Sequence, residues 1–182
     1  MGTKFSTRIW VSVVGIASIF LGSKGYADTV ISVADFGLKP DTRENAVAYV
    51  QKAIEACRGK EPVTLVFPEG RYDFWPQYAH EKNYYETNTY DVFPKRLAML
   101  FEGLHNITVD GNGSQFVMHD RIQPITVENC DGVTLKNFSI DWDIPLTAQA
   151  RVTKVGSDFF EIGINVLESP YIIEDGKLVF VG

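Results

Sequence analysis

The sequence contains few histidines and cysteines, the residues that hold zinc and that, for cysteine, cross-link small proteins. Its 182 residues include 3 histidines and 2 cysteines, Cys57 and Cys130, and none of them stands at a metal-ligand spacing. A metal centre and a disulfide-based fold are therefore not expected. An oxidising compartment would permit the two cysteines to pair, but two free thiols are favoured, because free cysteine packs as a small hydrophobic side chain.

The sequence also lacks an apolar run long enough to cross a membrane. Its longest run, residues 9–21, has 13 residues, whereas a transmembrane helix needs about 20. Two basic residues precede this run, and Gly25 and Ala27 follow it as the small residues of a cleavage site. We therefore interpret residues 1–27 as a signal peptide. The protein is expected to be exported, periplasmic or secreted, with no membrane span after cleavage.

Positive charge is scarce as well. The chain has 23 acidic and 17 basic residues, and three of the basic ones lie in the expected signal peptide, which contains no acidic residue. An acidic protein repels a phosphate backbone, so no nucleic-acid partner is expected. The same charge suits a neutral substrate better than an anionic one.

The sequence does contain a pattern of short strands around one expected helix. Residues 30–33 and 63–67 are short apolar runs typical of strands. Between them, Asp41 and Glu44 have the spacing of a capping box, and apolar residues then recur every three or four positions. We expect a helix that begins after Asp41, and an N-terminal cap of strand, helix and strand over residues 28–75.

A repeat follows this cap. Residues 106–111 align with residues 132–137 at an offset of 26, and residues 124–129 supply a further short strand. Each unit ends in Asp, Asn or Gly, which suit turns. A period in the twenties is typical of a solenoid, so we expect residues 76–145 to form its first coils. A small β-sandwich with fortuitous spacing is the alternative.

The pattern changes after residue 145. Apolar and polar residues alternate over residues 148–152 and again over 160–164, which indicates a hairpin. We expect residues 146–182 to form a β-rich accessory element. Because the chain ends within an apolar run, it is expected to be the N-terminal part of a longer protein.

An aromatic-rich segment, residues 72–93, carries the first candidate site residues. Aromatic rings stack on sugars, and neighbouring polar groups can bind hydroxyls. Within this segment Asn88, Tyr90 and Asp91 are candidate substrate-binding residues. The alternative is that the segment fills space around the N-terminal cap.

A second candidate is the run Asp141-Trp142-Asp143. In a strand, alternation places Asp141 and Asp143 on one face and Trp142 on the other. Residues two apart lie roughly 6.6–6.8 Å apart, inside the carboxylate spacing of inverting glycosidases. Asp141 and Asp143 are therefore candidate catalytic residues and Trp142 a candidate substrate-binding residue. The alternatives are that the carboxylates order a turn before Pro145, or bind substrate without acid–base chemistry.

The segments 35–37 and 66–72 resemble the opening of enzymes of the pectin lyase-like superfamily. That resemblance implies a right-handed parallel β-helix whose N-terminal end is covered by a helix. The expected fold class is thus all-β: a right-handed parallel β-helix with an N-terminal capping helix and a β-rich inserted element near the C-terminal end.

A narrower resemblance is carried by Tyr84-Tyr85, Lys95-Arg96-Leu97, residues 107–111 and above all residues 135–145. These strings resemble glycoside hydrolase family 110, bacterial exo-acting α-1,3-galactosidases. The resemblance implies inverting acid/base hydrolysis of terminal α-1,3-linked galactose from blood-group-B-type or related glycans. It implies no metal or organic cofactor, and it places the catalytic carboxylates of a complete enzyme beyond this chain's end.

Two other functions stay open at this point. One is another polysaccharide-degrading enzyme of the pectin lyase-like superfamily. Such an enzyme would need a basic groove for acidic sugars, and the excess of acidic residues in this chain argues against one. A non-catalytic glycan-binding β-helix would carry coils without a convergent carboxylate pair. The sequence does not decide the oligomeric state.

Overall fold

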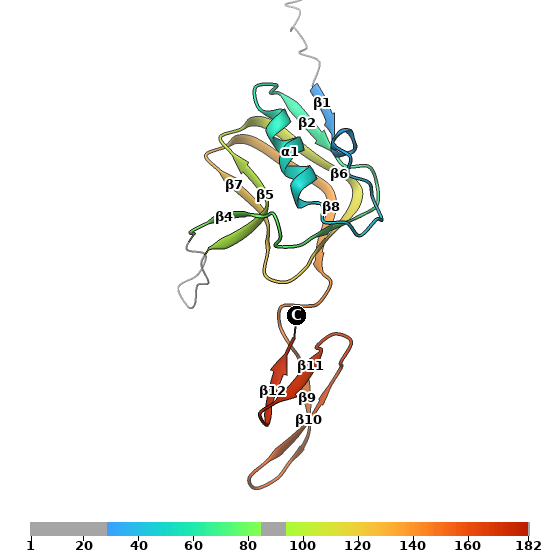
Figure 1. The fold of residues 1–182 in the computed structure, drawn as a ribbon, viewed down its shortest axis with the longest axis vertical. Coiled ribbons are helices and arrows are strands. Elements are labelled where there is room, and N and C mark those ends of the chain that lie inside the picture. The colour runs from blue at the N-terminus through green and yellow to red at the C-terminus, as the bar shows by residue number, and fades with distance from the viewer. Residues whose placement is uncertain (1–28, 85–93, 182) are drawn as a thin grey trace, which may run out of the picture.

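The computed structural model describes residues 29–84 and 94–181, which form twelve strands, one α-helix and one short 3-10 helix (Figure 1). The expected signal peptide lies outside the described residues, as do Asn88, Tyr90 and Asp91. Among the described residues, no helix is both long and apolar enough to cross a membrane.

Parallel pairing dominates the first part of the chain. One sheet runs in the order β1-β2-β6-β3, and β8 pairs with β6 along nearly its whole length. All of these pairs are parallel. The strands are β1 (Thr29–Ser32), β2 (Val63–Val66), β3 (Arg71–Phe74), β6 (His105–Met118) and β8 (Asp131–Trp142).

The pairing register confirms the sequence repeat. Ile107 pairs with Val133 and Asp110 with Lys136, so the aligned segments lie side by side at the expected offset of 26. A register shift follows, after which Ser114 pairs with Phe138. The described residues are mostly strand with one α-helix, as an all-β class requires, and their parallel pairs argue against a small sandwich of antiparallel strands.

A second sheet lies beside the first. It consists of β4 (His80–Lys82), β5 (Lys95–Glu102) and β7 (Gln123–Glu128). Strands β5 and β7 pair in parallel, and β4 pairs with β5 in the antiparallel sense. The two sheets enclose the core, and helix α1 (Val47–Cys57) packs against β1, β2 and β5 (Figure 1).

The core is continuous from the helix to the strands. The apolar face expected for the helix is buried, since Val47, Val50, Ile54 and Cys57 are all within the core cluster. Phe67, Tyr72, Phe74, Phe116 and Phe138 meet further along as a group of contacting rings.

The helix start expected at Asp41 was wrong. The helix begins at Val47, and the Asn45 side chain accepts a hydrogen bond from the Val47 N–H at 3.1 Å. Asp41 instead adopts a left-handed backbone with φ of 61°, and its carboxylate accepts the backbone N–H of Arg71 at 2.9 Å. The Asp41 carboxylate therefore holds the start of β3 instead of capping the helix, and its left-handed backbone is one that Asp tolerates in turns.

Both cysteines are free thiols, as the sequence favours. Cys57 is buried in α1, and its thiol donates to the Ala53 carbonyl at 3.2 Å. Burial raises the pKa of this thiol to about 11. Cys130 is partly buried, and its sulfur accepts the Leu104 N–H at 3.4 Å.

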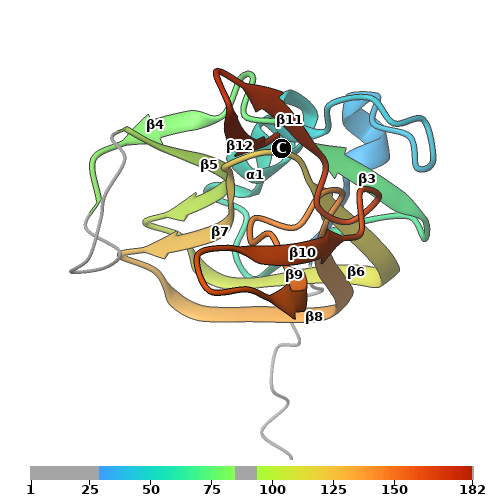
Figure 2. The ribbon, with the colours of Figure 1, turned by 90° about the horizontal axis from the view of Figure 1, so that it is seen from below.

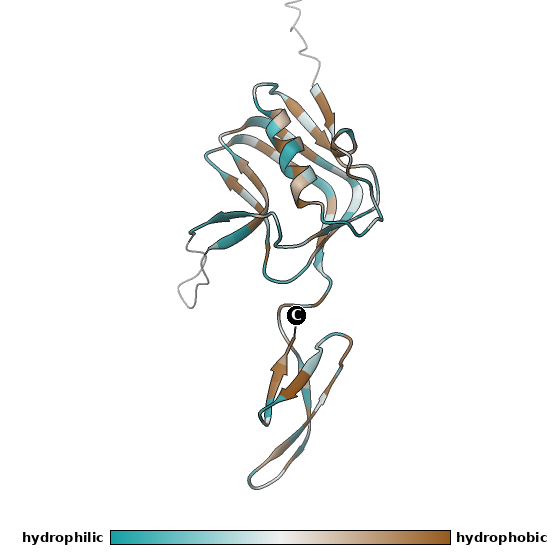
Figure 3. Ribbon diagram, viewed as in Figure 1, coloured by the Kyte–Doolittle hydropathy of each residue, from teal (hydrophilic) through white to brown (hydrophobic). Residues whose placement is uncertain are grey.

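The last part of the chain forms two antiparallel hairpins, which Figure 2 views from their side of the molecule. They pair β9 (Ala150–Val155) with β10 (Phe160–Ile164), and β11 (Tyr171–Glu174) with β12 (Lys177–Phe180). The alternating pattern therefore predicted the hairpin correctly. Figure 3 shows apolar residues along these strands. Most of their large apolar side chains are exposed, including Phe160. The boundaries at residues 75 and 145 stay predictions.

Candidate functional site

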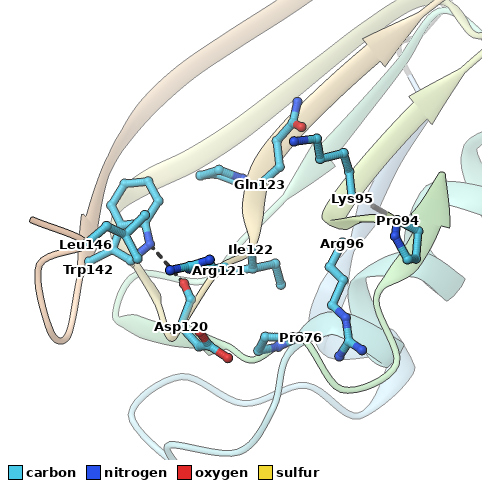
Figure 4. Close-up of a pocket in the computed structure, with 11 residues that line it drawn as sticks. Pro76, Pro94, Lys95, Arg96, Asp120, Arg121, Ile122, Gln123, Trp142 and Leu146 are labelled. Atoms are coloured by element: carbon cyan, nitrogen blue, oxygen red, sulfur yellow. Dashed lines mark hydrogen bonds between the residues drawn. The ribbon is translucent and has the colours of Figure 1, made fainter. Parts of the chain in front are cut away.

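A cavity of about 820 Å³ opens where the two sheets meet, at the C-terminal end of β8 (Figure 4). Its walls come from the connections around β3, β5, β7 and β8 rather than from strand centres. They are Pro76, Pro94, Lys95, Arg96, Asp120, Arg121, Ile122, Gln123, Pro124, Trp142 and Leu146. A cavity of this size is typical of small-molecule sites.

Trp142 is the aromatic residue of this cavity. Its ring packs partly against the hydrophobic core, and its indole N–H donates to the Asp120 carbonyl at 3.3 Å (Figure 4). Asp120 has a left-handed backbone with φ of 55°, which turns the chain before β7. Because its N–H is bonded, the ring has a fixed orientation, as a stacking surface for a sugar requires.

A charged network lies beside Trp142, built from residues 71, 73, 119 and 143. The Arg71 guanidinium contacts Asp73 at 2.6 Å and Asp143 at 3.1 Å. His119 Nε2 lies 2.8 Å from the Asp73 carboxylate, and its Nδ1 lies 3.8 Å from Asp143. Trp75 stacks on the His119 ring, with centroids 3.9 Å apart and planes 6° from parallel.

Asp73 is the buried member of this network. Burial opposes its ionisation, but hydrogen bonds from Arg71 and His119 outweigh burial and hold the pKa of Asp73 below its ordinary value. A buried carboxylate with two such donors is fixed in position. It orients the side chains of Arg71 and His119, and these two side chains in turn face Asp143.

The structure separates the three residues predicted at the end of β8. Asp143 joins the charged network, whereas Asp141, within β8, accepts the backbone N–H of its neighbour Trp142 at 2.8 Å. Trp142 packs on the core and lines the cavity, but neither carboxylate lines it. Catalytic roles for Asp141 and Asp143 stay predictions.

Another carboxylate pair lies on the second sheet. Glu102 and Glu128 pair in register, and the Lys82 ammonium bridges them at 2.7 and 2.8 Å. The Tyr84 hydroxyl also donates to Glu128. Hydrogen bonds from Lys82 and Tyr84 hold the pKa of Glu128 below its ordinary value.

Sequence reasoning missed Arg71, Asp73, His119 and the Glu102–Glu128 pair. One signal was present for the pair, because Glu102 and Glu128 are separated by the repeat offset of 26. Arg71 and Asp73 stand two apart in one strand, a spacing that places them on one face, but strand register brings His119 to Asp73, and the sequence alone does not display that register. Over the described ranges 29–84 and 94–181, no group of three or more His, Cys, Asp or Glu side chains is arranged to hold a metal ion.

No family model matches the chain. Individual relatives do. The chain is 60% identical over 156 residues to an α-1,3-galactosidase B of Bacteroides thetaiotaomicron, covering 86% of this chain and 25% of the relative. It is 37% identical over 153 residues to an α-1,3-galactosidase A of Shewanella woodyi, covering 84% and 25%. It is 36% identical over 154 residues to an α-1,3-galactosidase B of Phocaeicola vulgatus, covering 82% and 24%.

The chain therefore spans about a quarter of the length of these relatives, while the match covers most of the chain itself. As its resemblance to glycoside hydrolase family 110 predicts, the chain is a homologue of bacterial α-1,3-galactosidases.

Proposed function

We propose that this chain is part of an exported glycoside hydrolase that removes terminal α-1,3-linked galactose from blood-group-B-type or related glycans. The observation that carries this proposal is the 60% identity over 86% of the chain to an α-1,3-galactosidase. The chain corresponds to a quarter of that relative, so the described residues supply only part of the enzyme.

The proposed architecture is a right-handed parallel β-helix. The parallel order β1-β2-β6-β8 and the parallel pair β5-β7 support it, because stacked coils pair each strand with its equivalent one coil later. Helix α1 would cover the N-terminal end of the stack, where unpaired strand edges and core are otherwise exposed. The hairpins from β9 to β12 would be an inserted β-rich element.

Hydrolysis in the proposed enzyme is inverting and uses two carboxyl groups. One donates a proton to the leaving oxygen, and the other takes a proton from the attacking water on the opposite face of the sugar. Asp141 and Asp143 are the candidates within this chain, with Trp142 as the proposed stacking surface. The charged network around Asp73 would fix the position of Asp143.

The test is hydrolysis of galactosyl-α-1,3-galactose and of a blood-group-B trisaccharide by the purified chain, with released galactose as the readout. Circular dichroism on the same sample reports folding. Released galactose supports the proposal and places both carboxyl groups within this chain. A folded sample that releases no galactose contradicts activity of this chain alone. It would mean that the catalytic carboxyl groups lie outside this chain or that the chain has a glycan-binding role.

If galactose is released, Asp141→Asn and Asp143→Asn are each expected to lower kcat by at least ~100-fold, the usual effect of removing a general acid or base. Asp158→Asn is the matched control, because Asp158 is an exposed aspartate in a hairpin turn. Full activity in both variants would exclude the two residues from the chemistry.

Export is a separate part of the proposal. If residues 1–27 are a signal peptide, the protein recovered from outside the bacterial cytoplasm begins at Asp28. N-terminal sequencing of the secreted or periplasmic protein checks this. A mature protein that still begins at Met1 would contradict cleavage.

A further inference from the structure

The cavity at Trp142 has a charge opposite to that of the whole chain. The chain has 23 acidic and 17 basic residues, yet the cavity lining holds three basic side chains and one acidic one. The basic residues are Lys95, Arg96 and Arg121, and the acidic residue is Asp120. An acidic protein that gathers cations around one cavity creates a local site for negative charge.

Arg121 is the cation most available to a ligand. Arg96 already contacts Glu81 at 3.4 Å, whereas Arg121 makes no hydrogen bond or ion pair with any residue that the structure describes. It is exposed, and Figure 4 shows it within the cavity lining between Trp142 and Ile122. A guanidinium offers paired N–H donors whose geometry matches a carboxylate or a sulfate.

The other walls suit a sugar ring rather than a bare anion. Trp142 provides an aromatic surface, and Ile122 and Leu146 provide apolar surface beside it. The side-chain oxygen of Gln123 is buried without a hydrogen-bond partner among the described residues. A buried acceptor without a donor is costly, and a ligand hydroxyl would satisfy it.

We propose that this cavity binds an acidic sugar, one that carries a carboxylate or a sulfate ester. Trp142 stacks on the ring, Arg121 pairs with the anionic group, and Gln123 accepts a hydroxyl. In a glycan this sugar would be a neighbour of the galactose that is removed. That placement rests on the proposed function, but binding to the cavity does not.

The test compares three monosaccharides of one configuration: galactose, galacturonic acid and galactose-6-sulfate. Binding to the purified chain is measured by NMR titration at low salt. At least one acidic sugar is expected to bind ~10-fold or more tightly than galactose, since hydrogen bonds to charged groups are the stronger ones. Whichever of the two acidic sugars binds more tightly identifies the anionic group as a carboxylate or a sulfate ester. Equal affinity for all three sugars would overturn the proposal.

Variants place the binding in this cavity. Arg121→Gln should reduce the preference for the acidic sugar over galactose to about twofold or less. Trp142→Ala should lower the affinity for all three sugars. Arg151→Gln is the matched control, because Arg151 is an exposed arginine of β9. A folded Arg121→Gln protein that retains the preference would refute the assignment. Because the readout is binding, a failure here is distinct from a failure to release galactose.

Discussion

Phe116 contacts four other aromatic rings. Its centroid lies 4.7 Å from that of Phe67 and 4.8 Å from that of Phe138, and Tyr72 and Phe74 lie at 6.2 and 5.6 Å. The ring is fully buried, so its removal leaves a cavity lined by side chains that cannot all move inward.

Phe116→Ala is therefore expected to lower the free energy of unfolding by about 3–5 kcal/mol. Urea denaturation measures the change. Phe160→Ala serves as the control, because Phe160 is 66% exposed. This substitution should lower the free energy of unfolding by well under half as much. Similar losses in the two variants would show that the aromatic group does not hold the core together.

Asp73 links stability to pH. Its pKa lies below the ordinary value in the folded protein, so its contribution to stability is present above about pH 4, the unfolded value. The contribution is lost as the pH falls through the lowered folded pKa.

Asp73→Asn should thus destabilise the protein by about 3 kcal/mol at pH 6, the low end for a broken buried ion pair, because Arg71 keeps Asp143 as a partner. The difference between variant and wild type should shrink below pH 4. Urea denaturation between pH 2.5 and 6 measures it. Glu55→Gln, which removes an exposed pair with Arg58, should change little at any pH. A difference that does not depend on pH would contradict the assignment.

At the scale of elements, the contact between β6 and β8 depends on a glycine at the register shift. A Cβ atom on Gly111 would lie 2.5 Å from the Phe138 Cβ and 2.7 Å from the Asn137 carbonyl. Both atoms belong to the paired strand, so neither can move without disturbing the pairing.

Gly111→Ala is expected to destabilise the protein by about 1–3 kcal/mol through this overlap. Gly163→Ala is the matched control, because the nearest atom to its added Cβ would be at 3.5 Å, an ordinary contact. Thermal unfolding compares the two. If Gly111→Ala were no more destabilised than Gly163→Ala, the close approach of the strands would not be limiting.

The sequence predicted elements well where one local pattern decides the outcome. The buried face of α1, the strand near Val63 and the offset between β6 and β8 all follow from the spacing of apolar residues. The start of α1 does not follow from apolar spacing, because the Asp41 carboxylate accepts the backbone N–H of Arg71, a residue 30 positions away. Arg71 and Asp73 are two apart on β3, so strand alternation could have placed them on one face. His119 was missed for the same reason as the helix start, since only the register of β3 and β6 brings it to Asp73.

At the scale of the whole molecule, two parts of the chain differ in how they bury apolar surface. The parallel strands and α1 enclose a core, whereas the segment from β9 to β12 leaves large apolar side chains exposed, Leu167 at 87% and Ile173 at 66% among them. Contiguous exposed apolar surface promotes association.

The purified chain is therefore expected to associate as its concentration rises. Sedimentation velocity from micromolar to hundreds of micromolar concentration measures this. Leu167→Lys with Ile173→Lys should shift the chain toward monomer without loss of folding, because both residues are exposed. Lys52→Glu, on the exposed side of α1, is the control. A chain that stays monomeric at every concentration would contradict association through the exposed apolar side chains of the hairpins.

The walls of the cavity are strand ends and the connections between them, while the core is made mainly by the interiors of the strands and by α1. Of the lining residues, Ile122 and Trp142 also belong to the core. A one-residue change of length within a strand would shift every later residue to the opposite face. An exchange at Pro94, Arg96 or Arg121, which lie outside the core, alters only the rim. Most residues that line the cavity are consequently not the ones that hold the fold together. The scaffold can acquire a new specificity by exchanging a few rim positions, at little risk to its stability.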